Sequence, residues 1–249
     1  MLITIYNIYV ESVVFVRKNI FVVVPFVLFQ IVCFLLNIWT RNDTTFARFT
    51  YQFIYFLSFC LATVFVVVAV YKREAIIRNE ETILQAAWRS YGSVVLLILY
   101  TVFDILVLGF AVSLLFKILD FPDAGKEILV SLVIAAFFVS FPLSLRHMIY
   151  HGKIFVSDSI KAGFVELYMH PLFYLCIFLS GVVVSLFPSL LSPVSWSVLP
   201  FMPIVEWTGA RQINAINWFG VLLYPFVSAV IEVSLTYAFI LKNKNPVIS

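Results

Sequence analysis

Asp104 and Glu232 are acidic residues that lie near the middle of long apolar runs. A charge at the centre of a bilayer costs at least about 2.5–3.5 kcal/mol on insertion scales, so such residues usually face the interior of a helix bundle. We therefore treat the two carboxyls as a candidate intramembrane polar site. They could be sensitive to protons or cations, or could anchor a cationic substrate. Alternatively, each protonated carboxyl forms a hydrogen bond to a neighbouring helix.

His147 and His151 are four residues apart and therefore share one face of a helix. The same spacing occurs in one of the several histidine boxes of membrane di-iron desaturases. This chain has only 3 histidines, so we predict no metal site and no cofactor. It also lacks the G-x-S-x-G, H-E-x-x-H and Walker A motifs. We therefore predict no catalytic residues and no enzymatic activity.

Basic residues near the ends of the apolar runs are better suited to binding lipid headgroups than to catalysis. We expect such contacts at the inner membrane face from Arg17, Lys18, Lys72, Arg73, Arg146 and His147.

All of these residues lie in or next to six apolar stretches of the chain, which determine their positions. They cover about 20–39, 51–71, 93–116, 128–149, 171–190 and 218–241. Each is about long enough to cross a bilayer as a helix. An isolated strand would leave its backbone N–H and C=O groups unpaired in lipid, so each stretch is predicted to be helical.

The composition supports this interpretation, because 63% of the 249 residues are hydrophobic and 12% are charged. A soluble domain has about 45–50% apolar and about 25% charged residues. We therefore predict an all-α integral membrane protein, with 1–249 forming a single polytopic domain. The net charge of +3 does not indicate a nucleic-acid partner. Membrane lipids are the expected partners, together with other membrane-protein subunits.

The basic residues also predict an orientation. Of the 16 Lys and Arg residues, 11 fall on one side of the six spans and 5 on the other. The positive-inside rule places the side with 11 in the cytoplasm. We therefore predict a multi-pass protein of the cell membrane with both termini in the cytoplasm.

The inner segments suggest a threefold repeat. Residues 80–89 and 157–167 have apolar residues at helical spacing, and Ile5, Ile8 and Ser12 repeat this pattern before the first span. Each unit is expected to contain an inner amphipathic helix and a hairpin of two spans. Ser157 or Asp158 could cap the second inner helix. The apolar loop 191–217 is expected to lie in the outer interface as a partial lid.

Two segments resemble a known family. They are Ile83–Ala87 leading into Arg89-Ser90-Tyr91, and the run from Ser157 to Phe164 leading to His170-Pro171-Leu172. They resemble the repeated units of six-helix bacterial and archaeal membrane domains, typified by the domain fused to some glycerophosphodiester phosphodiesterases. The resemblance covers nearly the whole chain and implies a six-helix membrane fold. The chain has no phosphodiesterase domain, so the resemblance implies no catalytic residue.

Three functions are compatible with these features. The first is a non-enzymatic scaffold or accessory subunit that docks partners or lipids, which we favour because there is no catalytic constellation. The second is a transporter or permease subunit coupled to a separate ATPase through the inner helices. The third is an intramembrane enzyme that acts on lipid, which would require polar residues from different spans to converge.

Overall fold

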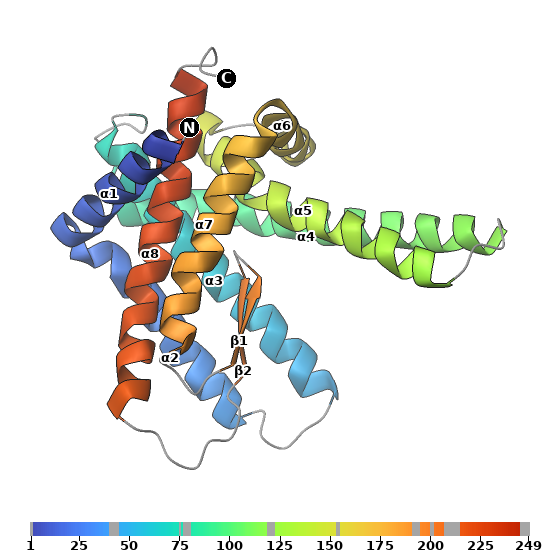
Figure 1. Cartoon of the computed structure of the whole chain (residues 1–249), viewed down its shortest axis with the longest axis horizontal. Helices are drawn as coiled ribbons and strands as arrows, with labels where there is room; N and C mark the ends of the chain where they lie inside the picture. The colour runs from blue at the N-terminus through green and yellow to red at the C-terminus, as the bar shows by residue number, and fades with distance from the viewer. Residues whose placement is uncertain are drawn as a thin grey trace. The chain divides into compact units, whose positions relative to one another are not determined.

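The computed structural model describes residues 2–39, 45–74, 76, 81–118, 123–152, 155–190, 195–199, 202–206 and 215–244, and most of them are helical (Figure 1). The elements, in order, are α1 (Leu2–Lys18), the 3₁₀ helix η1 (Ile20–Val23), α2 (Val24–Trp39), α3 (Thr45–Arg73), α4 (Ile83–Ile118), α5 (Asp123–His151), α6 (Val156–Met169), α7 (Pro171–Leu190), β1 (Ser195–Leu199), β2 (Met202–Glu206) and α8 (Ala215–Lys244).

The predicted spans all fall on helices, namely α2, α3, α4, α5, α7 and α8. Within the described residues, α4 and the Leu223–Asn243 part of α8 are each long and apolar enough to cross a membrane. Two sharply bent pairs, α1 with Ile20–Val32 and α6 with Pro171–Gly181, bring the number of candidate spans to as many as 4. The chain is therefore a helical protein with two to four candidate membrane spans, and the six-span topology remains a prediction.

Two local expectations differ from the structure. The inner segment 80–89 is not a separate helix, because α4 begins at Ile83 and continues to Ile118. A capping box starts it: Gln85 N–H donates to Thr82 Oγ1 at 3.2 Å, and Thr82 N–H donates to Gln85 Oε1 at 3.0 Å. The second difference is in α6, where neither Ser157 nor Asp158 is the cap.

In α6, the backbone carbonyl of Phe155 accepts hydrogen bonds from the N–H groups of Asp158 and Ser159. The helix begins at Val156, two residues earlier than a cap at Ser157 requires. Asp158 lies in its first turn, where a carboxylate interacts favourably with the helix dipole.

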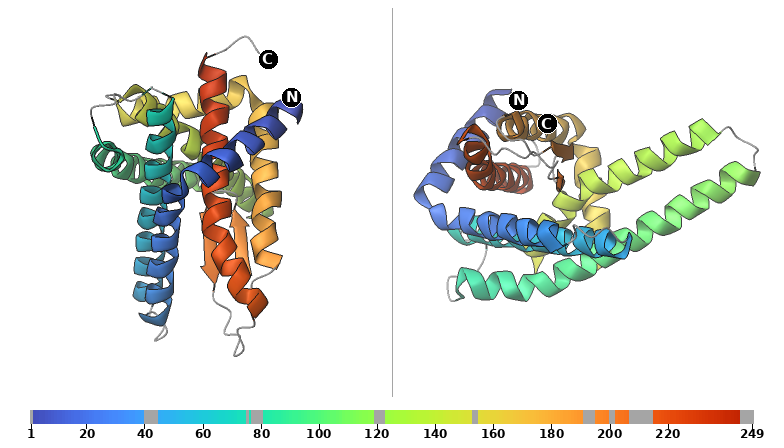
Figure 2. Two further views of the ribbon diagram at one scale, coloured as in Figure 1. Left: turned by 90° about the vertical axis from the view of Figure 1, so that its left-hand side faces the viewer. Right: turned by 90° about the horizontal axis from the view of Figure 1, so that it is seen from below.

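The chain forms two compact units, 1–87 with 170–249, and 88–169, and the single polytopic domain stays a prediction. In the first unit, α8 packs against α1, α2, α3 and α7, and α1 crosses it (Figure 2, left). Two predicted hairpins, α2 with α3 and α7 with α8, pack as pairs in this unit.

The exposed side of α1 carries apolar residues together with the polar Asn7 and Glu11. Ile5, Ile8 and Phe15 are buried, and several large apolar side chains along the helix are exposed. These exposed residues are Leu2, Ile3, Tyr6, Val10, Val13 and Val14. Its basic residues, Arg17 and Lys18, are confined to the last turn.

In the second unit, α5 packs closely on α6, with small residues four apart on each helix. These are Ser140 and Ser144 on α5, and Ser159 and Gly163 on α6. A Cβ atom on Gly163 would lie 2.8 Å from the Ser140 carbonyl oxygen and closer still to Ser144 Oγ. The approach of the two backbones therefore requires glycine at position 163.

The predicted outer loop contains a two-stranded antiparallel hairpin, in which Ser195 pairs with Glu206 and Leu199 with Met202. The sequence analysis missed this element. The alternation of polar and apolar residues from Ser195 to Val198 is the period-two pattern of a strand and could have indicated it.

Candidate functional site

Glu232 lies in the core of the first unit. It belongs to α8 and is only 3% exposed. Cys60 of α3, which is also buried, lies close enough to interact with it electrostatically. One turn along α3 from Cys60, the buried Thr63 hydroxyl has no hydrogen-bond partner among the described residues. The α3–α8 contact therefore holds a carboxyl, a thiol and a hydroxyl in apolar surroundings.

Two other buried hydroxyls of α8 are satisfied within their own helix. Ser234 Oγ donates to the Val230 carbonyl at 2.8 Å, and Thr236 Oγ1 donates to the Glu232 carbonyl at 2.7 Å. Such bonds to the preceding turn let a polar residue remain in an apolar helix.

Asp104 has different surroundings. It lies in α4, in the second unit, and is half-buried. No group in the described part of the chain forms a hydrogen bond or ion pair with it. Because Asp104 and Glu232 belong to different units, the structure does not assemble them into one described site.

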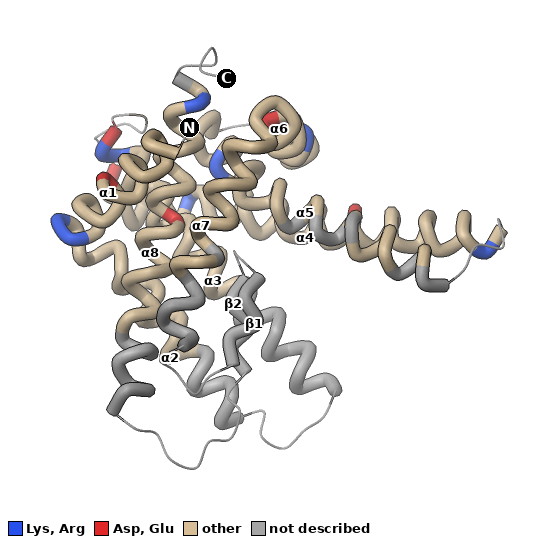
Figure 3. Tube along the Cα trace, viewed as in Figure 1, with Lys and Arg blue, Asp and Glu red and all other residues tan. Residues whose placement is uncertain are grey.

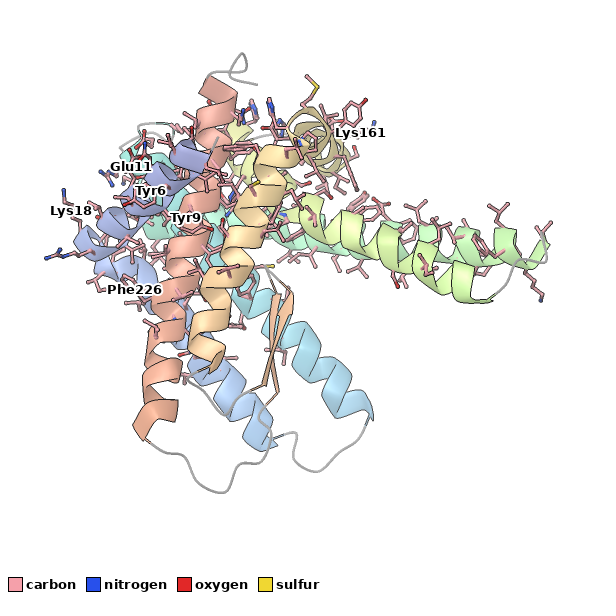
Figure 4. All side chains as sticks on the ribbon, viewed as in Figure 1. Tyr6, Tyr9, Glu11, Lys18, Lys161 and Phe226 are labelled. Atoms are coloured by element: carbon pink, nitrogen blue, oxygen red, sulfur yellow. The ribbon has the colours of Figure 1, made fainter. Side chains whose placement is uncertain are left out.

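Four of the basic residues that are expected at the inner membrane face belong to the first unit, in the last turns of α1 and α3. Arg17 and Lys18 are exposed in the last turn of α1, and Arg73 is exposed in the last turn of α3. Figure 4 shows the Lys18 side chain pointing away from the unit. Lys72 is partly buried and donates a hydrogen bond from Nζ to the Glu81 carbonyl. Hereafter, "the inner basic site" means Arg17, Lys18, Lys72 and Arg73.

Aromatic side chains hold Arg73 in place. Its guanidinium carbon lies 5.1 Å from the centre of the Phe15 ring, and Nη1 is 3.3 Å from the Tyr237 hydroxyl oxygen, to which it donates. The Phe15 and Tyr237 rings meet edge to face at 6.2 Å. Contacts with α1 and α8 thus fix the position of the Arg73 guanidinium.

A second cation of this unit is paired with a ring in the same way. Lys242 of α8 is buried, and its Nζ lies 4.7 Å from the centre of the Phe173 ring of α7. The sequence analysis counted Lys242 only as an inner charge and did not single out Phe15, Phe173 or Tyr237. The sequence feature that could have identified these three aromatic residues is their position close to the basic ends of the predicted spans.

Tyr9 fixes α1 on α7. Its hydroxyl donates to the Ile177 carbonyl at 3.4 Å, and Ser180 Oγ lies 3.1 Å away as a donor (Figure 4). Burial raises the pKa of Tyr9 above its ordinary value, and the hydrogen bond from Ser180 lowers it by less. The hydroxyl is therefore neutral at physiological pH and suits a buried position.

Arg146 and His147 lie in the second unit. Arg146 is completely buried, and its Nη1 donates to the Pro142 carbonyl at 2.8 Å. This burial leaves no guanidinium surface for a headgroup, so Arg146 does not belong with the other expected lipid contacts. Pro142 has no backbone N–H and therefore donates no hydrogen bond to the preceding turn of α5.

His147 is half-buried, and its ring centre lies 4.4 Å from that of His151, as their spacing predicts. Within the residues that the structure describes, no three His, Cys, Asp or Glu side chains gather to hold a metal ion.

No protein-family model, curated protein or solved structure matches this chain. The resemblance to six-helix membrane domains therefore rests on the sequence segments described above.

Proposed function

We propose that this chain is a non-enzymatic, multi-pass membrane protein that acts as a scaffold or accessory subunit and binds anionic lipid headgroups at the inner basic site. The observation that carries the proposal is the fixed and exposed Arg73, stacked on Phe15 and bonded to Tyr237. A guanidinium fixed in this way can bind a phosphate through its remaining N–H groups.

The arrangement of the first unit supports a common inner side. The beginning of α1 and the end of α8 lie at the same end of the unit (Figure 1). The Lys and Arg residues that Figure 3 colours in this unit also lie in the half nearer that end. In the proposed topology this end faces the cytoplasm, where anionic lipids attract basic residues by about 1 kcal/mol each.

The test uses the full-length protein in nanodiscs of phosphatidylcholine alone and of phosphatidylcholine mixed with phosphatidylglycerol. We expect the anionic lipid to raise the midpoint of thermal unfolding of the wild type. The double variant Arg17→Gln/Lys18→Gln and the single variant Arg73→Gln should each lose part of that increase. Lys117→Gln is the matched control, because Lys117 is exposed at the far end of α4. Equal increases in all four proteins would contradict the proposal.

Glu232 favours the transporter alternative, because a carboxyl only 3% exposed in a candidate span is suited to carrying a proton or binding a cation. Proteoliposomes containing Glu232→Gln test it. A pH- or cation-dependent flux that the wild type supports and this variant loses would favour transport. The copurification of an ATPase would identify the coupled form.

A further inference from the structure

We propose that the headgroup bound beside Arg73 is phosphoethanolamine, with its phosphate on Arg73 and its primary ammonium on Glu11 and Glu74. This assignment rests on the proposed lipid binding at the inner basic site and names the lipid class that binds there. It stands on the mixture of charges around Arg73 and on the aromatic contact that Arg73 makes.

Two carboxyl groups share the surroundings of the Arg73 guanidinium. Glu74 directly follows Arg73, the last residue of α3, and its backbone N–H continues the helix by donating to the Val70 carbonyl at 3.0 Å. Glu11 lies on α1 one turn before Phe15, whose ring contacts Arg73. Residues four apart on a helix share one face, so Glu11 lies on the side of α1 that meets Arg73.

The Tyr237 hydroxyl links these charges. It accepts a hydrogen bond from Arg73 Nη1 at 3.3 Å, and Glu11 and Glu74 are both close enough to interact with it electrostatically. Arg73 and Glu11 are exposed and Glu74 is partly buried, so a ligand can reach all three side chains. The cluster therefore offers one guanidinium and two carboxyls to the same headgroup.

A phosphoethanolamine headgroup complements this mixture. Its phosphate accepts hydrogen bonds from a guanidinium, and its primary ammonium has three N–H donors, as a lysine side chain has. A headgroup with negative charge alone, such as phosphatidylglycerol, can also place its phosphate on Arg73 but is repelled by Glu11 and Glu74. Arg17 and Lys18, in the last turn of α1, attract the phosphate of either lipid.

Phosphocholine is a poorer match. Its ammonium is fully methylated and has no N–H group, so it is recognised through the faces of aromatic rings. The ring in contact with Arg73 belongs to Phe15, which is only 1% exposed and has no face left for a second cation. The site should therefore select phosphatidylethanolamine over phosphatidylcholine through its two carboxyls.

The selectivity is tested with the full-length protein in detergent micelles that contain equal amounts of these two lipids. Native mass spectrometry gives the ratio of phosphatidylethanolamine to phosphatidylcholine bound to the protein. We expect enrichment of phosphatidylethanolamine by about 2- to 10-fold, the range for one net hydrogen bond, and a smaller enrichment of its N,N-dimethyl derivative. A ratio near one would overturn the assignment, whereas stabilisation by phosphatidylglycerol in the nanodisc test would still support the inner basic site.

The role of the carboxyls is tested in the same micelles. Glu11→Gln should lower the ratio, and the double variant Glu11→Gln/Glu74→Gln should bring it close to one. Asp158→Asn is the matched control and should keep the ratio of the wild type, because Asp158 is an exposed carboxyl of the second unit. Enrichment that persists in the double variant, or that is lost equally in the control, would overturn the proposal. Thermal unfolding in lipid-free detergent, unchanged from the wild type, verifies that the variants are folded.

Discussion

The helices α4 and α8 each meet the requirements for a membrane span, but they have opposite surroundings. In α8, 83% of an 18-residue apolar stretch within Leu223–Asn243 is buried inside the structure, compared with 22% of such a stretch in α4. Each helix also carries one acidic residue near its middle. Glu232 of α8 is enclosed by its own unit, whereas Asp104 of α4 is half-exposed.

This difference shows that apolar length identifies a span but does not identify what surrounds it. The polar content of a helix is more informative. Glu232, Ser234 and Thr236 follow closely on α8 and are all buried, which is typical of a helix surrounded by protein. The exposed half of α4 is dominated by Leu, Val and Phe, which lipid can solvate.

The largest expected effect comes from removing the ring of Phe239 from α8, and removing the ring of Phe110 from α4 is the comparison. Phe239 of α8 is 1% exposed, so Phe239→Ala should lower the free energy of unfolding by about 3–5 kcal/mol. Phe110 of α4 is 70% exposed, and Phe110→Ala should change it by less than about 0.5 kcal/mol. Denaturant unfolding of the purified protein in detergent measures both. Similar losses would show that the two helices are equally enclosed, and the comparison would fail.

The second prediction concerns packing in the second unit. It compares the tight contact between α5 and α6 with the exposed helix α4. Gly163→Leu should lower the free energy of unfolding by about 1–3 kcal/mol, because its side chain would overlap Ser144 and the backbone of Ser140. Gly109→Leu on α4 is the matched control, because nothing lies within 4 Å of its added Cβ. Thermal unfolding should separate the two variants. A larger loss at Gly109 would place the tight contact on α4 instead.

A third prediction concerns the inner end of α8. Lys242→Gln removes the cation above the Phe173 ring and should lower the free energy of unfolding by about 0.5–2 kcal/mol. Lys117→Gln, at the exposed end of α4, should have no measurable effect. Gln retains two of the four methylenes of the lysine stem, so a loss in the first variant reports the charge together with part of that stem. If Lys242→Gln is as stable as the wild type, the ring contact does not hold α8.

Much of the fold could be predicted from local sequence. The apolar runs located the long helices, and the fifth predicted span has the same bounds as α7, because Pro171 starts that helix. The capping box of Thr82 and Gln85 could also be predicted from the sequence, because its two partners are three residues apart. These features depend on neighbours along the chain.

The candidate site was less predictable, because its contacts join distant segments. Arg73 and Tyr237 are 164 residues apart, and no pattern near either residue identifies the other. The burial of Arg146 could not be predicted from the sequence either, because its position at the end of a span is typical of a headgroup contact. The need for glycine at 163 becomes evident only when Ser140 and Ser144 lie opposite it.

The smallest expected effect concerns the hydrogen bonds that fix α1 beside α7. Tyr9→Phe keeps the ring but removes the hydroxyl, which lies 3.4 Å from the Ile177 carbonyl oxygen and 3.1 Å from Ser180 Oγ. We expect a loss of about 0.5–1.5 kcal/mol in the free energy of unfolding at neutral pH. Tyr6→Phe is the control, because the Tyr6 side chain is 68% exposed on the same helix.

The pH dependence of this loss distinguishes a buried hydroxyl from an exposed one. Burial raises the pKa of Tyr9 in the folded protein above the ordinary value of 10.0. Its contribution to stability is therefore complete below pH 10 and decreases at higher pH, because the unfolded chain loses the proton first. The difference between the wild type and Tyr9→Phe should shrink as the pH rises above 10. A difference that stays constant through this range would show that α1 leaves Tyr9 exposed to solvent and does not enclose it against α7.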